Sequence, residues 1–349
     1  MNRGATTDGK GKGSTGGSPR GVDRGTAHRL TDRSHKLLPL AVTVTLFVIL
    51  YGTGAYLFDG FLSLQVFLNL FIDNAFLTIT AIGMTFVILS GGIDLSIGSM
   101  IGLTTMVSAA LVVHREWSPA IVIPLVLTMG ATFGLVMGLI IQYFRIQPFI
   151  VTLAGLFVAR GICYLISIDS IAIENEFYSD AAAFRIPLVF DTSITINVVV
   201  ALVMLAIAIY LAHFTRFGRT VYAIGGNEHS ALLMGLPVAR TKVLVYTFNG
   251  LCSALAGVVF TFFTQSGNPL HAQGWELDAI TVVVVGGTLL TGGSGYVVGT
   301  LFGVLIYGTI QTMINFQGGL SSWWNKIVIG LLLLAFCLLQ QALVRTRRT

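Results

Sequence analysis

The chain has 349 residues, of which 54% are hydrophobic and only 10% are charged, and its mean hydropathy is +0.84. Soluble globular domains carry about 25% charged residues, so the composition excludes a soluble protein and predicts a polytopic membrane protein. Residues 1–36 hold eight Lys/Arg and three Asp, which accounts for the whole net charge of +5. Because this charge lies in a tail, it gives no case for nucleic-acid binding.

The tail of residues 1–36 is dominated by Gly, Ser, Thr, Arg and Lys and has almost nothing apolar to bury. We expect it to be a disordered basic tail on the cytoplasmic side. The transmembrane domain is predicted over 37–343, and a second basic cytoplasmic tail over 344–349.

A membrane-spanning helix needs about 20 apolar residues. The apolar runs predict an all-α domain of about ten transmembrane helices, some of them broken at Gly-rich bends. The eighth run is short, and the second contains Asp73 and Asn74 partway along. The candidates are 37–57, 64–90, 96–113, 119–143, 149–168, 194–212, 243–265, 278–291, 295–316 and 323–343.

The loops differ in charge, and basic loops stay in the cytoplasm. This rule places both termini and the loop 213–242 inside, and the acid-rich loop 169–193 outside. The tryptophans then fall at predicted outer borders, where indole rings settle. They are Trp117, Trp275, Trp323 and Trp324.

The loop 213–242 contains a predicted short helix with both ends marked. Asn227 can cap its first free amides, and Glu228 lies where the helix dipole favours an anion. Gly235 can adopt the left-handed conformation that ends a helix, and Pro237 follows it. Such a helix suits docking of a cytoplasmic partner, although the loop could instead serve only to fix the topology.

A weak internal repeat links two glycine-rich bends. Ser90-Gly91-Gly92 and Thr291-Gly292-Gly293 match at a constant offset of 201 residues. Glycine-interrupted segments in corresponding halves often mark a translocation path, because broken helices expose backbone groups to a cavity. Coincidence is the competing explanation, since the chain contains 40 glycines.

Hydrolytic, redox and nucleotide-binding motifs are missing from the sequence, so no catalytic residue and no metal site is predicted. Ionisable residues inside a bilayer are costly and are therefore functional candidates. Asp94 follows a glycine pair, and either it or Ser96 could cap the next helix or line a polar path. Arg160 is interpreted as structural, paired with a carboxylate or with free carbonyls.

Five further polar residues are candidates for a substrate path. Asp73 and Asn74 could line such a path or hydrogen-bond between helices. Asn249, Gln265 and Asn268 flank the seventh predicted span and could hydrogen-bond a sugar hydroxyl, although an interhelical bond is the commoner use of such residues.

Several motifs occur together and in order: GMTFVILSGGIDLSIGS (83–99), VTLAGLFVARG (151–161), RFGRTVYAIGGNEHSALLMGL (216–236) and VVVGGTLLTGGSG (283–295). On these motifs the chain resembles inner-membrane permeases of the ribose/arabinose/xylose class of ABC sugar importers, from about residue 37 to 343. The segments 73–96, 276–303 and 314–327 are most similar to a permease subunit of bacterial galactofuranose importers.

The resemblance implies a non-catalytic permease in the bacterial inner membrane that moves a monosaccharide, galactofuranose, by ATP-driven alternating access. It implies a second related permease, a periplasmic sugar-binding protein, and an ABC ATPase that carries ATP and Mg while this chain binds no cofactor. The family's coupling helix maps onto 222–235, with Gly225, Gly226, Asn227 and Glu228 at its entrance. The coupling residues would be Tyr222, Gly225, Gly226, Asn227, Glu228 and Gly235.

Two alternatives remain open on the sequence. The substrate could be another simple sugar, such as a ribose-like pentose or a hexose. The chain could also be a proton-coupled secondary transporter that uses Asp94 or Asp73 as its proton relay.

Overall fold

The computed structural model describes residues 24–187, 192–319, 321 and 323–345. It divides the chain into a unit of residues 1–38 and a unit of residues 39–349. Helix α1 (Arg24–Leu57) begins well before the predicted boundary at residue 37, so residues 24–36 are helical and not disordered as predicted. Residues 24–36 contain no proline and a single glycine, so nothing within this stretch stops a helix, and α1 continues through Pro39.

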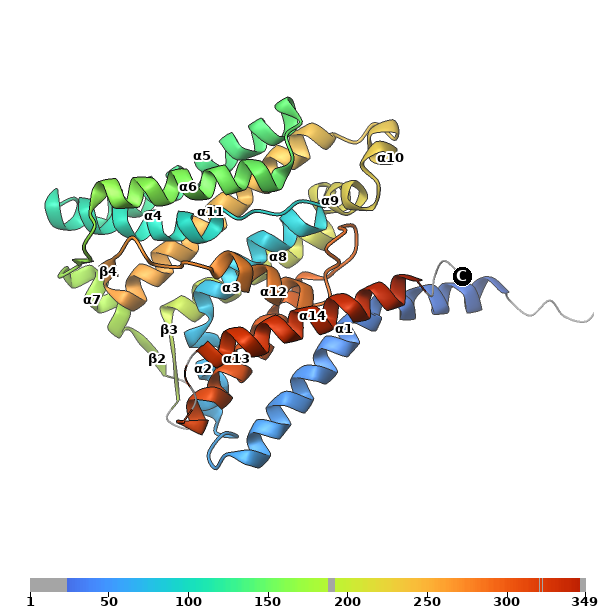
Figure 1. Cartoon of the computed structure of the whole chain (residues 1–349), viewed down its shortest axis with the longest axis horizontal. Coiled ribbons are helices and arrows are strands. Elements are labelled where there is room, and N and C mark those ends of the chain that lie inside the picture. Colours follow the sequence, from blue (N-terminus) through green and yellow to red (C-terminus); the bar gives the residue numbers. More distant parts are fainter. Residues whose placement is uncertain (1–23, 188–191, 320, 322, 346–349) are drawn as a thin grey trace, which may run out of the picture. The chain divides into compact units, whose positions relative to one another are not determined.

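The second unit consists mainly of helices (Figure 1). The helices after α1 are α2 (Leu64–Asp73), α3 (Ala75–Leu89), α4 (Ile97–Ala109), the π-helix η1 (Ala110–His114), α5 (Pro119–Phe144), α6 (Pro148–Ile166), α7 (Glu176–Ala183), α8 (Ile196–Phe214), α9 (Arg216–Gly226), α10 (Glu228–Leu233), α11 (Val238–Thr264), α12 (Trp275–Val285), α13 (Val297–Gln317) and α14 (Trp323–Arg345).

The all-α prediction misses two short antiparallel strand pairs. Strand β1 (Ile171–Ala172) pairs with β4 (Ser266–Gly267), and β2 (Arg185–Pro187) pairs with β3 (Ser193–Thr195). The first pair joins loops that are nearly a hundred residues apart, so its partners cannot be read from local sequence.

Seven described segments are long and apolar enough to cross a membrane, and α2 with α3 forms a further span bent by 55°. The chain is therefore a multi-pass membrane protein, but the described residues do not reproduce ten spans. Helix α12, inside the predicted span 278–291, is 11 residues long. That length covers about 16 Å, short of the roughly 30 Å hydrocarbon core. Gly286 and Gly287 end the helix, and residues 286–291 are loop.

The connections of this unit gather at two ends (Figure 1). One end, here called the α7 end, holds α7, the strand pairs and the connection from η1 to α5. The other, called the α10 end, holds α9, α10 and the two glycine-rich bends, residues 90–96 and 286–296. Helices α5 and α11 connect the two ends.

Helices α5 and α11 pack unusually closely because glycines face each other across the contact. Gly130, Gly134 and Gly138 follow one another at four-residue spacing along α5, and all three contact α11. A methyl group on Gly134 would overlap the carbonyl oxygen of Tyr246, and one on Gly250 would overlap that of Gly130. Small residues at four-residue spacing permit this approach between membrane helices.

Candidate functional site

The α10 end carries the short helix predicted from its end signals. The Asn227 side chain accepts a 2.8 Å hydrogen bond from the amide of Ser230, as expected of an N-cap. Gly235 has φ +75°, and the amide of Leu236 donates to the carbonyl of Ala231 at 3.1 Å. This is the Schellman geometry that ends helices at glycine. Glu228, in the first turn, pairs with Lys242 at 2.6 Å.

The segment 222–235, onto which the family's coupling helix maps, contains parts of two helices that meet at Asn227. The extended backbone of Asn227 ends α9 and begins α10. Tyr222, Gly225 and Gly226 therefore lie in the last turns of α9, while Glu228 lies in α10. Asn227 breaks the helix because its side chain satisfies the amides of the next helix only from a non-helical backbone.

The end of α9 rests on the glycine-rich bends. The Tyr222 hydroxyl donates a 2.8 Å hydrogen bond to the carbonyl of Gly295. Burial, together with the neighbouring Tyr296, raises the pKa of Tyr222 to about 12, so the hydroxyl keeps its proton at neutral pH. A methyl group on Gly225 would overlap the carbonyl of Leu89 and the amide of Gly293, whereas Gly226 faces open space.

The two bends of the internal repeat contact each other directly. Gly91 and Gly292 both have φ +82°, a conformation that glycine adopts without steric cost. A methyl group on Gly292 would lie 2.8 Å from the amide nitrogen of Gly91. The repeat is therefore a pair of equivalent turns that meet beneath α9.

A cavity of about 360 Å³ lies toward the α7 end, among α2, α3, α11, α12 and α13. Two predicted substrate-path residues, Asp73 and Asn74, line it where α2 meets α3. Asp73 is exposed, whereas Asn74 is buried and donates to the carbonyl of Leu70 at 2.9 Å. The break between α2 and α3 therefore brings polar groups to this cavity.

One wall of the cavity is aromatic. Phe76 and Trp275 stack with ring centroids 4.4 Å apart, and Phe260 meets Trp275 edge-to-face at 4.8 Å. Phe263 extends this wall and also lines the cavity. Trp275 therefore lines the cavity, because the turn before α12 places its ring on Phe76.

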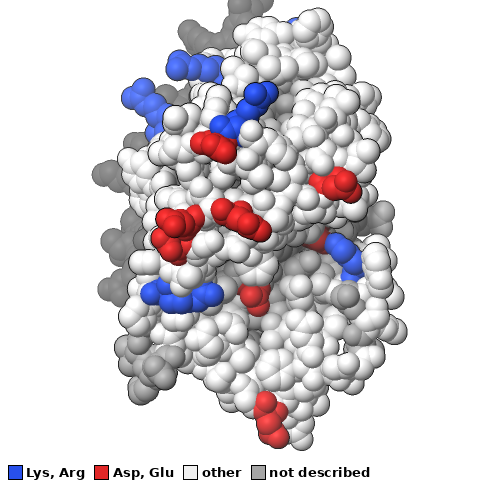
Figure 2. All heavy atoms as spheres, turned by 90° about the vertical axis from the view of Figure 1, so that its left-hand side faces the viewer, with Lys and Arg blue, Asp and Glu red and all other residues white. Residues whose placement is uncertain are grey.

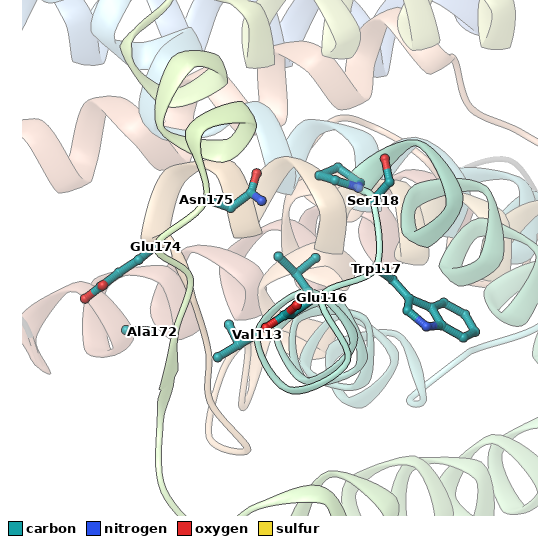
Figure 3. Close-up of a pocket in the computed structure, with 9 residues that line it drawn as sticks. Val113, Glu116, Trp117, Ser118, Ala172, Glu174 and Asn175 are labelled. Carbon is teal, nitrogen blue, oxygen red and sulfur yellow. The ribbon is translucent and has the colours of Figure 1, made fainter.

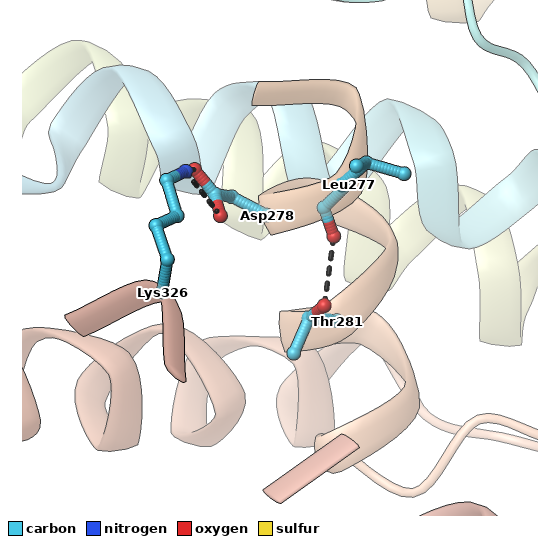
Figure 4. A network of polar contacts seen from close by, with 4 residues as sticks. All are labelled: Leu277, Asp278, Thr281 and Lys326. Atoms are coloured by element: carbon cyan, nitrogen blue, oxygen red, sulfur yellow. Dashed lines mark hydrogen bonds and ion pairs between the residues drawn. The ribbon is translucent and has the colours of Figure 1, made fainter. Parts of the chain in front are cut away.

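The cavity also contains hydrogen-bonding groups. Asp278 is buried and forms an ion pair with Lys326, whose Nζ lies 2.7 Å from one carboxylate oxygen and 3.0 Å from the other. Figure 4 shows Lys326 reaching from α14 to α12, where the Thr281 hydroxyl donates to the carbonyl of Leu277. The side-chain amides of Gln311 and Asn315, which also line the cavity, have no partner among the described residues.

Asp94, Ser96 and Asn249 form a separate buried cluster. One Asp94 carboxylate oxygen accepts from the Ser96 amide at 2.8 Å and from its hydroxyl at 2.6 Å, and the other accepts from the Asn249 amide at 2.8 Å. Asp94 thus holds the turn ahead of α4 and also bonds to α11. The Tyr246 hydroxyl and the Asn249 carbonyl oxygen are buried without a partner among the described residues.

The remaining candidates hold the loop after α11. Arg160 donates to the carbonyls of Pro269 and His271, so the free-carbonyl alternative describes its contacts. Asn268 accepts from the amide of Leu270 at 2.8 Å, and the Gln265 carbonyl accepts from Ile173 at 2.9 Å. Neither Gln265 nor Asn268 lines the cavity.

The α7 end is rich in acidic side chains (Figure 2). A surface pocket of about 580 Å³ lies between the connection from η1 to α5 and the segment from β1 to α7. Figure 3 shows Glu116 and Trp117 on one side of it and Glu174 and Asn175 on the other. Asp191, in the same predicted outer loop, lies outside the described residues.

Sequence reasoning missed most of the cavity. Trp275 and Asp278 come from α12, and Gln311 and Asn315 from α13. Lys326, which pairs with Asp278, comes from α14, and nothing in the local sequence joins these residues. One feature of the sequence could have found part of it. Asp278 and Lys326 lie in two different predicted apolar spans, and opposite charges in such spans commonly pair.

Comparison of the sequence with known proteins identifies the relatives of the chain. The family model "Branched-chain amino acid transport system / permease component" matches residues 66–337. The chain is 49% identical over 306 residues to the inner membrane ABC transporter permease protein YjfF of Escherichia coli, covering 88% of this chain and 92% of that protein. No solved structure matches the chain.

Two further relatives are named for sugars. The chain is 39% identical to the fructose import permease protein FruG of Bifidobacterium longum, covering 88% of this chain and 92% of that protein. It is 37% identical to the ribose import permease protein RbsC of Escherichia coli, covering 82% and 89% respectively. With these relatives and a family match over most of its length, the chain belongs to the branched-chain amino acid transport system / permease component family and, within it, to the permease subunits of the ribose/arabinose-type ABC sugar importers.

Proposed function

We propose that the chain is the permease subunit of an ABC importer in the bacterial inner membrane, and that it moves a monosaccharide, galactofuranose, inward. It catalyses no reaction, and a separate ATPase with ATP and Mg powers its alternating access. Family membership and relatives named for fructose, ribose and arabinose import support the transport of a sugar. The motif resemblance of 73–96, 276–303 and 314–327 supports galactofuranose.

The cavity between α2, α3, α11, α12 and α13 is the observation that carries this proposal. Its volume of about 360 Å³ lies within the range of small-molecule sites, roughly 300–1,000 Å³. Phe76 and Trp275 can cover the apolar face of a sugar ring. Asp278, Gln311 and Asn315 can replace the hydrogen bonds that its hydroxyls lose on leaving water, which cost several kcal/mol if unmade.

The α10 end supplies the proposed coupling to the ATPase. Leu232 and Leu233 of α10 and Met234, which caps its C-terminus, are all exposed. An apolar helix tip of this kind suits a groove on a partner protein. Because α9 rests on both glycine-rich bends, force on α10 would reach α3, α4, α12 and α13. A second related permease completes the path across the membrane.

The acidic α7 end would face the periplasm and receive the sugar-binding protein. Replacing Glu116, Asp169, Glu174, Glu176 and Asp180 by their amides should slow delivery at low salt, because surface charges steer encounters most when screening is weak. Unchanged uptake at low salt would remove this part of the proposal.

The decisive experiment reconstitutes the chain with its ATPase, second permease and binding protein in proteoliposomes. Labelled galactofuranose should enter only with ATP, and Trp275→Ala should raise the KM for uptake while Trp275→Phe preserves it. Faster uptake of ribose or a pyranose hexose would reassign the sugar. Uptake by the chain alone, driven by a proton gradient without ATP, would replace the whole proposal with a secondary transporter.

A further inference from the structure

A second surface pocket, of about 620 Å³, lies at the α10 end between α9 and α11. Arg216 opens α9 two residues after the apolar span that ends at Phe214, and Arg240 lies two residues into the span that begins at Val238. The pocket is therefore at the edge of two membrane-spanning segments, where the bilayer surface meets the protein.

Three guanidinium groups line this pocket: those of Arg216, Arg219 and Arg240. No acidic side chain is among its lining residues, and none of the three arginines has an ion pair among the described residues. The nearby carboxylate of Glu228 is already engaged by Lys242. Three exposed arginines around one hollow favour an anion, and their planar donors match the oxygens of a phosphate.

The rest of the pocket is largely apolar. Phe217, Leu236 and Leu244 line it, and Leu244 is exposed on the membrane-spanning part of α11. A soluble anion such as phosphate would gain nothing from these side chains. A phosphate joined to hydrocarbon chains would use both parts, with its head on the arginines and its chains along α11. Basic pockets at helix ends are typical of anionic lipid recognition.

We propose that the pocket of Arg216, Arg219 and Arg240 binds the phosphate of an anionic phospholipid, with its acyl chains against Leu236 and Leu244. A lipid held there would brace α9 against α11, beside the two bends on which α9 rests. The site is distinct from the exposed apolar side chains of α10, which are proposed to meet the ATPase.

The test compares lipid binding to the purified, full-length chain in complex with its partners. Native mass spectrometry would follow titration with phosphatidylglycerol and, separately, with zwitterionic phosphatidylethanolamine. The triple variant Arg216→Gln/Arg219→Gln/Arg240→Gln is matched by Arg115→Gln/Arg145→Gln/Arg185→Gln, which removes equal charge from residues that do not line the pocket. We expect phosphatidylglycerol affinity to fall at least tenfold in the first variant and to stay unchanged in the second.

Three results would overturn the proposal. The first is undiminished phosphatidylglycerol binding by the pocket variant. The second is displacement of the lipid by millimolar inorganic phosphate, which would make this a soluble-anion site. The third is loss of ATPase association with lipid binding intact, which would make the arginines a protein contact. If the triple variant fails to fold, the three single Arg→Gln variants are measured, and each should weaken phosphatidylglycerol binding.

Discussion

The backbone amide of Gly293 donates a 2.9 Å hydrogen bond to the carbonyl of Leu89, which joins two bends that are about two hundred residues apart in sequence. Gly225 of α9 packs against both residues. The helix proposed to receive the ATPase is thereby seated on the point where both glycine-interrupted segments change direction. Movement of α9 cannot leave these bends unchanged, because no side chain lies between the backbones.

Gly225→Ala should destabilise this junction, because its methyl group would overlap the backbone of Leu89 and Gly293. Overpacking of this kind costs about 1–3 kcal/mol. We expect a lower thermal unfolding temperature in detergent. Gly226→Ala is the matched control, since its methyl group meets open space and should leave the unfolding temperature unchanged. Equal unfolding temperatures for the two variants would contradict the close packing of α9 on the bends.

Gly226→Trp should abolish transport while the protein remains folded in the membrane. Gly226 is exposed and has room for a large side chain, so the indole would protrude where the ATPase is proposed to dock. Membrane fractionation and thermal unfolding would confirm normal insertion, and ATP-dependent uptake would report the loss of coupling. Normal uptake by this variant would rule out docking at this surface.

Asp94→Asn should be tolerated and Asp94→Leu should not. The asparagine keeps an oxygen for Ser96, and Asn249 can turn its amide to present the carbonyl oxygen that has no partner among the described residues. Leucine would leave the buried donors of Ser96 and Asn249 without an acceptor, which would lower the free energy of unfolding by about 1–3 kcal/mol for each group. Thermal unfolding and uptake would measure both variants.

Loss of transport in Asp94→Asn with unchanged stability would instead indicate that the charge of Asp94 is needed, as in proton relay. The exchange variant Asp94→Asn/Asn249→Asp tests the same point, since it keeps one carboxylate and one amide in contact. If hydrogen bonding is the only requirement, it should transport as well as Asp94→Asn.

Asp278→Ala should raise the KM for sugar by about tenfold or more, because a hydrogen bond to a charged group contributes about 1.5–3 kcal/mol. Lys326→Met leaves the buried Asp278 carboxylate without its cation and should lower the unfolding temperature. The double variant Asp278→Ala/Lys326→Met should recover stability but keep the raised KM. If the double variant recovered both the stability and the original KM, Asp278 would serve only the ion pair and would not contact the sugar.

The short helix α10 shows how much local sequence can determine. Asn227, Glu228 and Gly235 mark its ends through hydrogen bonds and backbone angles that involve only neighbouring residues, so its limits could be predicted. The existence of apolar spans was equally predictable, because hydrophobic length alone makes a segment membrane-compatible. The repeat at an offset of 201 residues was visible in the sequence, but the contact between its two bends was not.

The cavity was decided by the tertiary structure alone. Trp275 stacks on Phe76, and Asp278 pairs with Lys326 from another helix. Asn249 and Asp94, 155 residues apart, are likewise brought together by the packing of α11. The sequence by itself determined which segments are apolar and where helices end, since these depend on neighbouring residues. Only the packing of helices that are distant in sequence decided which polar side chains share one cavity, because those side chains come from α2, α12 and α13.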